Sequence, residues 1–326
     1  MKHIKFLLQA VICNRKKVKW AFVALMISAL GCSKSNPPGY SGSPSGGTTG
    51  GGTTTGSGSN PLLSKEVLVA KNAAAADEDS IVTLFTYDGN KNLTQTEQTT
   101  FSNIAGASLT ISITYHFTYS NKLISGFTGT VDQTYLDAGQ TFSSNSQISS
   151  VFHASGSRID YYVQSVSTSG SAPLPVTLET GNDSATLTYD ASGNLSTLNI
   201  YQLSQGSSEY QQISQQNFTY SNGNLSKSIN VESVSGIVTN TVTSLFQYDS
   251  KISAAPIFIV PGVPVNSTND LSSSTQTTTG LNAQTISTTY QTNYNSTNQP
   301  VNSLAALTIT PQNPENIATE TITYTY

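Results

Sequence analysis

One short motif recurs along the chain and constrains its fold more than any other feature. Its first copy is Phe85-Thr86-Tyr87-Asp88, which leads through Gly89-Asn90-Lys91-Asn92 to Leu93. Residues two apart in a strand point to the same face, and Asp, Asn and Gly favour the positive-φ positions of tight turns. The leucine after the turn can then pack across the hairpin against the tyrosine. Each copy therefore predicts a β-hairpin.

Five copies are clear, and the tyrosines that precede their turns are Tyr87, Tyr119, Tyr189, Tyr220 and Tyr248. Weaker copies occur around Phe152 and Tyr294, and residues 322–326 form half a copy. Most copies lie 28–37 residues apart, which leaves room for two strands and two turns. Because a lone hairpin is marginal in water, the hairpins must pair side by side. We expect an all-β fold, an antiparallel β-meander of repeated hairpins in a barrel-like or strongly curved sheet.

The repeated tyrosines admit two interpretations. As core aromatics they hold the hairpins together, since each ring buries about 150–250 Å². As a row on one exposed face they would form a stacking platform for sugars or peptides. Their repetition at the turn boundary favours a place in the hairpin core.

Alternation along the strands bears on whether the sheet crosses a membrane. From Ser108 to Tyr119, apolar and polar residues alternate strictly, which predicts one buried and one wet face. Around Tyr220 both faces carry carboxamides, so either Gln216 or Asn217 would have to face lipid. The outward face of a membrane barrel is apolar over about 25 Å. We therefore expect a soluble sheet or barrel, with a membrane barrel as the alternative because the aromatic C-terminus resembles an outer-membrane assembly signal.

The N-terminal residues are typical of a targeting sequence. Basic residues precede an 11-residue apolar stretch, residues 21–31, which is too short to span a bilayer. Cys32 follows Ser28-Ala29-Leu30-Gly31, which resembles a bacterial lipobox. We expect lipidation at Cys32; the alternative is an ordinary secretory signal with a chance cysteine. The predicted domains are a lipoprotein signal peptide (1–31), a Gly/Ser/Thr-rich tether (32–60) and a repeat-built β domain (61–326).

The Tyr-Asp-x-x-Gly-Asn-Leu pattern resembles the YD (Rhs-type) repeat. It is still more similar to that of uncharacterised Bacteroidota lipoproteins with a porin-like fold, in which a lipobox and a tether precede the hairpins. Further shared features are Tyr248-Asp249-Ser250-Lys251 followed by Pro256, and the final Tyr324-Thr325-Tyr326. The resemblance implies this fold and an outer-membrane lipoprotein, on the periplasmic face or at the cell surface. It assigns no catalytic residues.

Two segments interrupt the repeat. Prolines 256, 261 and 264 exclude a central strand from residues 254–265. This segment is either a loop packed over one end of the sheet or a plug or ligand lid. Residues 61–80 form either a short helix or a first strand.

Residues suited to catalysis or metal binding are few. Cys13 and Cys32 both lie in the targeting region, so the body has neither a disulfide nor a thiolate metal site. His116 is placed on the polar face of a strand and His153 in a turn, with no nucleophile motif nearby. We expect no catalytic residues, no metal and no cofactor. A net charge of −4 with scattered basic residues excludes a nucleic-acid footprint.

We interpret the acidic residues as structural rather than as catalytic or calcium-binding groups. Asp88, Asp190 and Asp249 recur at equivalent turn positions, which predicts turn capping through Asx hydrogen bonds. The cluster Asp77-Glu78-Asp79 is expected to be solvated rather than to bind calcium. Paired carboxylates of a glycan-acting enzyme would have to come from Asp132, Asp137, Asp160 or Glu179.

The sequence thus predicts an envelope lipoprotein with a structural or binding role and no catalysis. Its partners are the membrane, through the N-terminal lipid, and a glycan, a peptide or an envelope protein. Two alternatives remain: a carrier that holds a glycan or hydrophobic ligand in a cup-shaped sheet, and a glycan-acting enzyme with two carboxylates in a cleft.

Overall fold

The computed structural model describes residues 62–72, 78–104, 107–170, 180–203, 208–234, 236–252, 257–260, 263–265, 269–280, 283–310 and 317–326. The predicted signal peptide, the tether and Cys32 lie outside these ranges. So do Asp77, Glu179 and Pro256.

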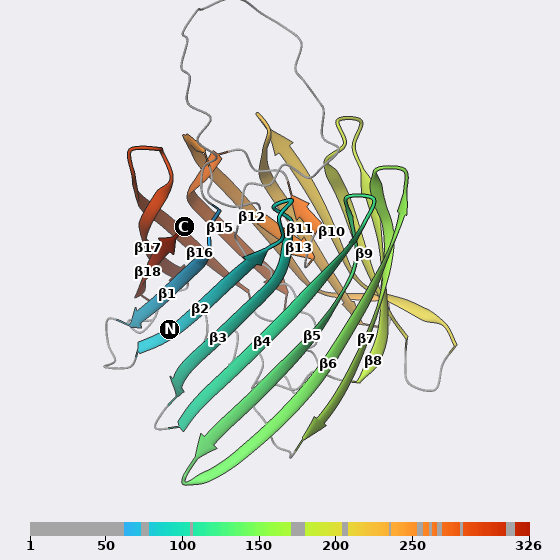
Figure 1. Ribbon diagram of the computed structural model, residues 1–326, viewed down its shortest axis with the longest axis horizontal. Helices are drawn as coiled ribbons and strands as arrows, with labels where there is room; N and C mark the ends of the chain where they lie inside the picture. The colour runs from blue at the N-terminus through green and yellow to red at the C-terminus, as the bar shows by residue number, and fades with distance from the viewer. Residues whose placement is uncertain are drawn as a thin grey trace, which may run out of the picture.

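Sixteen antiparallel strands form a closed barrel, which confirms the predicted all-β meander (Figure 1). Each strand pairs with its neighbour in sequence, and the last strand pairs with the first. The strands are β1 (Lys65–Asn72), β2 (Glu78–Tyr87), β3 (Leu93–Ile104), β4 (Ala107–Ser120), β5 (Leu123–Asp137), β6 (Gln140–Ser155), β7 (Arg158–Gly170), β8 (Gly181–Tyr189), β9 (Leu195–Leu203), β10 (Tyr210–Ser221), β11 (Asn224–Val234), β12 (Ile237–Ile252), β15 (Asn269–Gly280), β16 (Gln284–Tyr294), β17 (Pro300–Thr310) and β18 (Ile317–Thr325).

The proline-containing segment does not join the barrel ladder. It contributes β13 (Ile257–Val260) and β14 (Val263–Val265), which pair with each other as a separate two-stranded sheet. On either side of it, Ile252 of β12 pairs with Asn269 of β15, so the barrel continues across the insertion. Residues 65–72 form β1, which resolves the choice between a helix and a strand. No helix in the described ranges is both long and apolar enough to span a bilayer.

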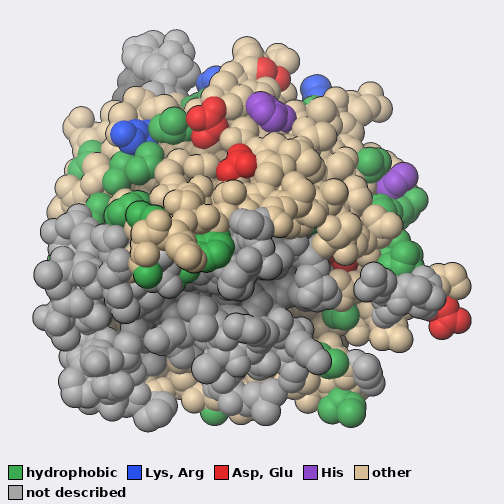
Figure 2. Space-filling view, turned by 90° about the horizontal axis from the view of Figure 1, so that it is seen from below, with side chains coloured by type: hydrophobic (Ala, Val, Ile, Leu, Met, Phe, Trp, Pro, Cys, Tyr) green, Lys and Arg blue, Asp and Glu red, His purple; other side chains and the backbone are tan. Residues whose placement is uncertain are grey.

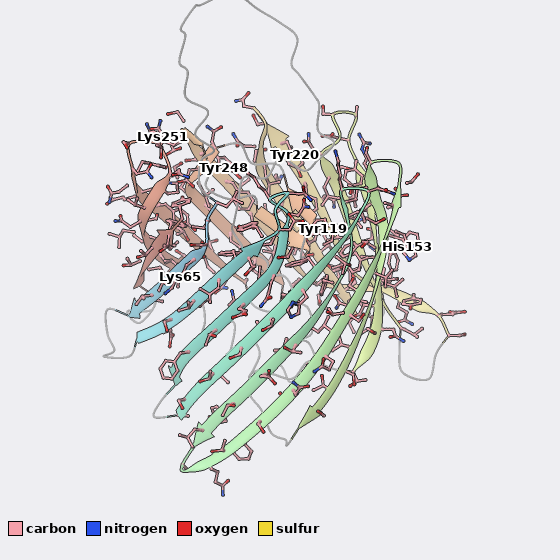
Figure 3. All side chains as sticks on the ribbon, in the orientation of Figure 1. Lys65, Tyr119, His153, Tyr220, Tyr248 and Lys251 are labelled. Atoms are coloured by element: carbon pink, nitrogen blue, oxygen red, sulfur yellow. The ribbon has the colours of Figure 1, made fainter. Side chains whose placement is uncertain are left out.

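The apolar face of the strands points into the barrel. On β4, Leu109, Ile111 and Ile113 are almost fully buried, whereas their polar neighbours are partly exposed. Figure 3 shows His153 of β6 directed away from the barrel wall, and its strand partner across the ladder is the exposed Tyr161. Because side chains alternate between faces, the strand register assigns every barrel residue to the inner or the outer wall.

The outer wall is mainly uncharged and polar. From β3 to β6 one outer row reads Gln95, His116, Thr128 and Ser149 across the ladders. On β9 and β10, the carboxamide of Gln215 donates to Oδ1 of Asn199 at 3.0 Å. In Figure 2, seen from below, the described surface consists mainly of backbone and uncharged side chains, with few charged side chains. A lipid-facing wall would instead be apolar.

The repeated tyrosines connect one hairpin to the preceding one. In four of the repeats, the hydroxyl donates to the main-chain oxygen of an aliphatic residue in the preceding repeat. Four such bonds are Tyr87 to Leu63 (3.1 Å), Tyr119 to Leu93 (2.9 Å), Tyr189 to Ile159 (3.0 Å) and Tyr248 to Leu225 (2.7 Å). We call these bonds the tyrosine ladder. Figure 3 shows Tyr119, Tyr220 and Tyr248 towards the same end of the barrel, here named the tyrosine end.

The half copy at the C-terminus is completed by the start of the described chain. The backbone N–H of Ser64 donates to the oxygen of Thr325 at 2.8 Å, and β1 pairs with β18 over eight residue pairs. Leu63 is buried and accepts the bond from Tyr87, as Leu93 does from Tyr119. Leu63 therefore occupies the aliphatic position of the last repeat, and this explains why the meander closes.

The recurring aspartates cap their turns, as predicted. Oδ1 of Asp88 accepts from the backbone N–H groups of Asn90 and Asn92, both at 2.8 Å, and Oδ2 accepts from the Asn92 side chain. Asp190 makes the equivalent bonds to Asn194. Because the Asn92 side chain and backbone donate to the charged form, the pKa of Asp88 lies below its usual value.

Candidate functional site

The inner wall is apolar near one end of the barrel and a mixture of apolar and polar residues towards the other. Near the tyrosine end, aromatic rings from neighbouring strands pack together: the Tyr115 and Phe127 centroids are 5.2 Å apart, and those of Phe152 and Tyr162 are 5.3 Å apart. These residues belong to one hydrophobic core that extends from Leu63 to Leu225. The core fixes the hairpins at this end.

Towards the opposite end, the inner wall carries polar side chains beside apolar ones such as Leu109 and Ile111 of β4. We call these polar side chains the lumenal belt. Its members are Asp79, Ser102, Gln133, Ser144, Asp183, Ser214, Glu232, Asn240 and Glu320, which face inwards from nine different strands.

Several belt members are fully enclosed. Asp79 and Ser102 are 0% exposed and Gln133 is 1% exposed. The strand register places Glu320, Ala70 and Asp79 in one row across β18, β1 and β2. In the next strand, the pairing of Ser80 with Phe101 brings Ser102 beside Asp79. The belt is thus continuous over the closure of the barrel.

Three belt side chains have no hydrogen-bond partner among the described residues. Both amide atoms of Gln133 and the hydroxyl oxygens of Ser144 and Ser102 are buried and unpaired. Gln133 and Ser144 are direct cross-strand neighbours on β5 and β6. More than nine in ten buried polar groups in proteins are paired, because an unpaired one costs about 1–3 kcal/mol. This pair is therefore an exception that calls for a functional explanation.

On the far side of the belt, the polar groups are connected. The hydroxyl of Ser214 donates to Oδ1 of Asn230 at 2.6 Å. The Asn230 amide contacts Oε1 of Glu232 at 3.5 Å, and the Asn240 amide donates to Oε2 of Glu232 at 3.1 Å. Strands β10, β11 and β12 thus hold one carboxylate in a fixed orientation on the inner wall.

The inner wall is acidic. By register, its described carboxyl groups are Glu66, Asp79, Asp183, Glu232 and Glu320. The described lysine and arginine side chains lie in or beside turns (Lys91, Lys122, Arg158, Lys251) or on the outer wall (Lys65, Lys227). Figure 3 shows Lys251 at the tyrosine end. No described basic side chain therefore neutralises the lumen.

Burial sets the protonation of these acids. Desolvation raises the pKa of Glu66 to about 8, and it also raises the pKa of Glu320 above the usual range of a glutamate. Burial and the nearby charge of Glu320 raise the pKa of Tyr290 to about 12. At neutral pH Glu66 thus keeps its proton.

A second polar cluster lies at the tyrosine end, where β12 ends and β15 begins. The hydroxyl oxygen of Tyr294 is 2.6 Å from Oδ2 of Asp249 and 2.8 Å from Oδ2 of Asp270. A phenol has one hydrogen, so both contacts are hydrogen bonds only when one carboxyl is protonated. Burial is the main cause that raises the pKa of Asp270. The cluster ties the end of β12 to the start of β15 and to β16.

The two described acids singled out from the sequence lie apart from each other on the outer wall, and Asp160 directly precedes Tyr161, the ladder partner of His153. His116 is exposed on β4, and His153 is in β6, stacked on Tyr161 at 4.2 Å, rather than in a turn. Asp132 and Asp160 are both exposed, and Asp132 bonds to Asn145. Asn145 pairs with Ser169, nine residues from Asp160 along β7, so the two acids are about 30 Å apart. The side chain of Asp137 and all of Glu179 lie outside the described part.

One prediction for the acidic residues was wrong. Asp79 is fully buried on the inner wall rather than solvated. The reason is its position in β2, where it lies opposite the buried Ala70. Asp77 and the side chain of Glu78 lie outside the described residues. Within the described ranges, no three His, Cys, Asp or Glu side chains converge as metal ligands would.

The hairpin tyrosines lie where the core meets the turns. Tyr87, Tyr119, Tyr189 and Tyr220 are half-buried and pack against the hydrophobic core, and Tyr248 is half-buried and bonds to Leu225. Burial, with a smaller effect of the Asp88 charge, raises the pKa of Tyr119 to about 12. The lumenal belt itself was not found from the sequence, because its members are polar residues in largely polar strands, and some of these strands, such as β3, are polar on both faces.

No protein-family model matches the chain, and no curated protein matches it in sequence. Several solved structures match the chain, and two of them align with most of its length. A porin-like protein from Bacteroides uniformis is 13% identical, with 81% of this chain and 96% of that chain covered and a TM-score of 0.48. A porin-like protein from Bacteroides vulgatus is 10% identical, with 81% and 98% covered and a TM-score of 0.36. The chain is thus similar to porin-like proteins from Bacteroides.

Proposed function

We propose that this chain is a non-catalytic binding protein of the bacterial envelope, anchored by a lipid on Cys32, whose barrel stands in water and binds a ligand in its lumen. The observation that carries the proposal is the orientation of the wall. Apolar residues such as Leu109 and Phe127 face inwards, whereas serine, threonine and carboxamide side chains face outwards. Such a barrel gains little by entering lipid, because most of its large apolar side chains already face the interior and only scattered ones, such as Leu84 and Val151, are exposed.

The sequence supplies the route to the envelope. The apolar stretch before Cys32 and the Gly/Ser/Thr-rich segment after it suit an anchor and a flexible tether. A single acyl chain binds membranes only weakly, and the diacylated cysteine of bacterial lipoproteins provides the two chains that stable anchoring needs. The anchor, rather than the barrel, would then hold the protein at the membrane.

The positions of the candidate catalytic residues support a role without catalysis. The described histidines are exposed on the outer wall, and Asp132 and Asp160 lie on separate parts of it. Two buried acids of the lumen, Glu320 and Asp79, lie in one row on either side of Ala70. Glycoside hydrolysis requires a glycosidic bond between two such carboxyl groups, whereas Ala70 and Asp79 are almost fully buried there.

A Cys32→Ser variant tests the proposal. Wild-type protein should sediment with membranes and dissolve in mild detergent, whereas the variant should appear in the soluble fraction with an intact β-sheet circular dichroism spectrum. The matched control is Cys13→Ser, which alters the other cysteine of the N-terminal region and should leave the wild-type distribution unchanged. A Cys32→Ser protein that stays in the membrane through an alkaline wash would refute the water-exposed barrel.

A further inference from the structure

We propose that Asp270, Tyr294 and Asp249 form a proton-operated clasp at the tyrosine end, closed while Asp270 carries a proton and open once that proton is lost. The clasp joins β15, β16 and β12, the three strands that supply these residues. The inference goes beyond the proposed binding role and does not depend on it. It rests on the two contacts of the Tyr294 hydroxyl and on the strand pairing around them.

The strand pairing leaves a gap at the clasp. The ladder between β15 and β16 ends at the pair of Ser273 and Thr289, so the first four residues of β15 have no ladder partner on β16. Asp270 lies in this unpaired stretch, and the end of β16 carries Tyr294. On the other side, residues 249–251 of β12 lie opposite Asp270 alone. Side chains therefore have to join the strands here.

The two distances indicate which acid carries the proton. The Tyr294 oxygen is 2.6 Å from Oδ2 of Asp249, a length typical of a hydroxyl that donates to a charged carboxylate. It is 2.8 Å from Oδ2 of Asp270, a length typical of a neutral O–H···O bond. The backbone N–H of Lys251 also donates to the other oxygen of Asp249, which favours its ionised form. The Asp270 carboxyl therefore donates to the Tyr294 oxygen, and the Tyr294 hydroxyl donates to the Asp249 carboxylate.

The acidic groups around Asp270 favour this arrangement. Burial is the main cause that raises the pKa of Asp270, and the charge of Asp249 adds to the effect. On β16, burial and the charges of Glu320 and Asp270 also raise the pKa of Tyr290, so that phenol stays neutral. A proton on Asp270 relieves the repulsion between these groups.

Lys251 provides the positive charge beside the clasp. Its ammonium group lies 5.8 Å from the centre of the Tyr294 ring and donates to Oδ1 of Asn298, in the turn after β16, at 3.1 Å. This hydrogen bond leaves both contacts of the Tyr294 hydroxyl to the two acids.

Loss of the proton opens the clasp. The phenol has a single hydrogen, and the charged Asp249 keeps it. Ionised Asp270 would then face the Tyr294 oxygen at 2.8 Å with no hydrogen between them, beside a second carboxylate. The start of β15 is therefore free to separate from β16. Because the folded pKa of Asp270 is raised, the clasp is closed at acidic pH and opens as the pH rises through that pKa.

The first test follows hydrogen exchange of the full chain by mass spectrometry, corrected for the intrinsic effect of pH on exchange. Relative to β4, the amides of residues 270–272 should exchange about tenfold faster at about pH 7 than at about pH 4, the effect of one lost charged hydrogen bond. Asp270→Asn keeps a donor to the Tyr294 oxygen at every pH and should abolish this difference. The matched control Asp160→Asn removes an exposed acid and should retain it. No difference in the wild type, or one that survives in Asp270→Asn, would overturn the proposal.

A second measurement uses the wild-type chain and tests the direction of the relay. In a carbon-13 NMR titration of the aspartate carboxyl groups, Asp270 should lose its proton at a higher pH than Asp249. Asp249→Asn should shift the Asp270 titration to lower pH, because it removes a neighbouring negative charge. If Asp249 is the acid that keeps its proton to the higher pH, or if Asp249→Asn leaves the Asp270 titration unchanged, the clasp is wrongly assigned. None of these results depends on the Cys32 experiment.

Discussion

The tyrosine ladder makes a quantitative prediction about what holds successive hairpins together. Tyr119→Phe keeps the ring and removes one hydroxyl, which donates to the main-chain oxygen of Leu93 at 2.9 Å. A typical intramolecular hydrogen bond contributes about 1 kcal/mol net, and an acceptor left buried adds a penalty of about 1 kcal/mol or more. Leu93 is 7% exposed, so part of that penalty applies. We expect the free energy of unfolding to fall by about 1–2 kcal/mol.

The assay is equilibrium unfolding in urea, followed by circular dichroism. The matched control is Tyr161→Phe, the same chemical change at a tyrosine that is 42% exposed on the outer wall, where substitutions usually stay within about 0.5 kcal/mol. Because Tyr87, Tyr119, Tyr189 and Tyr248 bond to different hairpins, their effects should add. If all four ladder variants behave like Tyr161→Phe, the ladder does not stabilise the barrel.

Three further changes probe other contacts. Asp190→Ala removes the acceptor that fixes Asn194 and should destabilise the protein by about 1 kcal/mol in urea, whereas Asp160→Ala should be nearly neutral. A Cβ atom at Gly129 would overlap the ring of Tyr115, so Gly129→Ala should lower the free energy of unfolding by about 1–3 kcal/mol. Adding Tyr115→Leu to this variant should restore part of the lost stability. If no stability is restored, the steric explanation is refuted. Because the folded pKa of Asp270 is raised, its protonated form stabilises the fold below about pH 3.8, and that contribution is lost as the pH rises through the folded value. The urea midpoint of Asp270→Asn should therefore lack this decline, and an unchanged pH profile would contradict the assignment.

The parts of the fold that follow from the sequence are those in which local chemistry and burial agree. The alternation from Ser108 to Tyr119 predicts β4 and its buried face, because every second residue is large and apolar. The recurring aspartates predict their turns, because an Asx cap is a local interaction. Closure of the barrel is harder to predict. It requires the segment after Leu63 to pair with the C-terminal half repeat, which is far away in the sequence, and no local pattern marks that pairing.

The candidate site could not be predicted from the sequence in this way. In β3, Gln98 and Ser102 face inwards and Gln95 and Glu97 face outwards, so the strand shows no hydrophobic alternation. Asp79 looks like part of a solvated acidic run until the register places it opposite Ala70. The unpaired state of Gln133 depends on which side chains surround it in three dimensions. A polar residue in a polar sequence gives no sign of burial, and only the closed barrel reveals the belt.

The direction of the apolar face is the central claim, and cysteine labelling along β4 tests it most directly. The only native cysteines are Cys13 and Cys32, so single substitutions in the barrel of a Cys13→Ser, Cys32→Ser protein give clean signals. Ser112→Cys and Thr114→Cys should react rapidly with a water-soluble maleimide, whereas Ile111→Cys and Ile113→Cys should react slowly until urea unfolds the barrel. Rapid labelling at 111 and 113 with protection at 112 and 114 would mean that the apolar face points outwards, and would contradict the account.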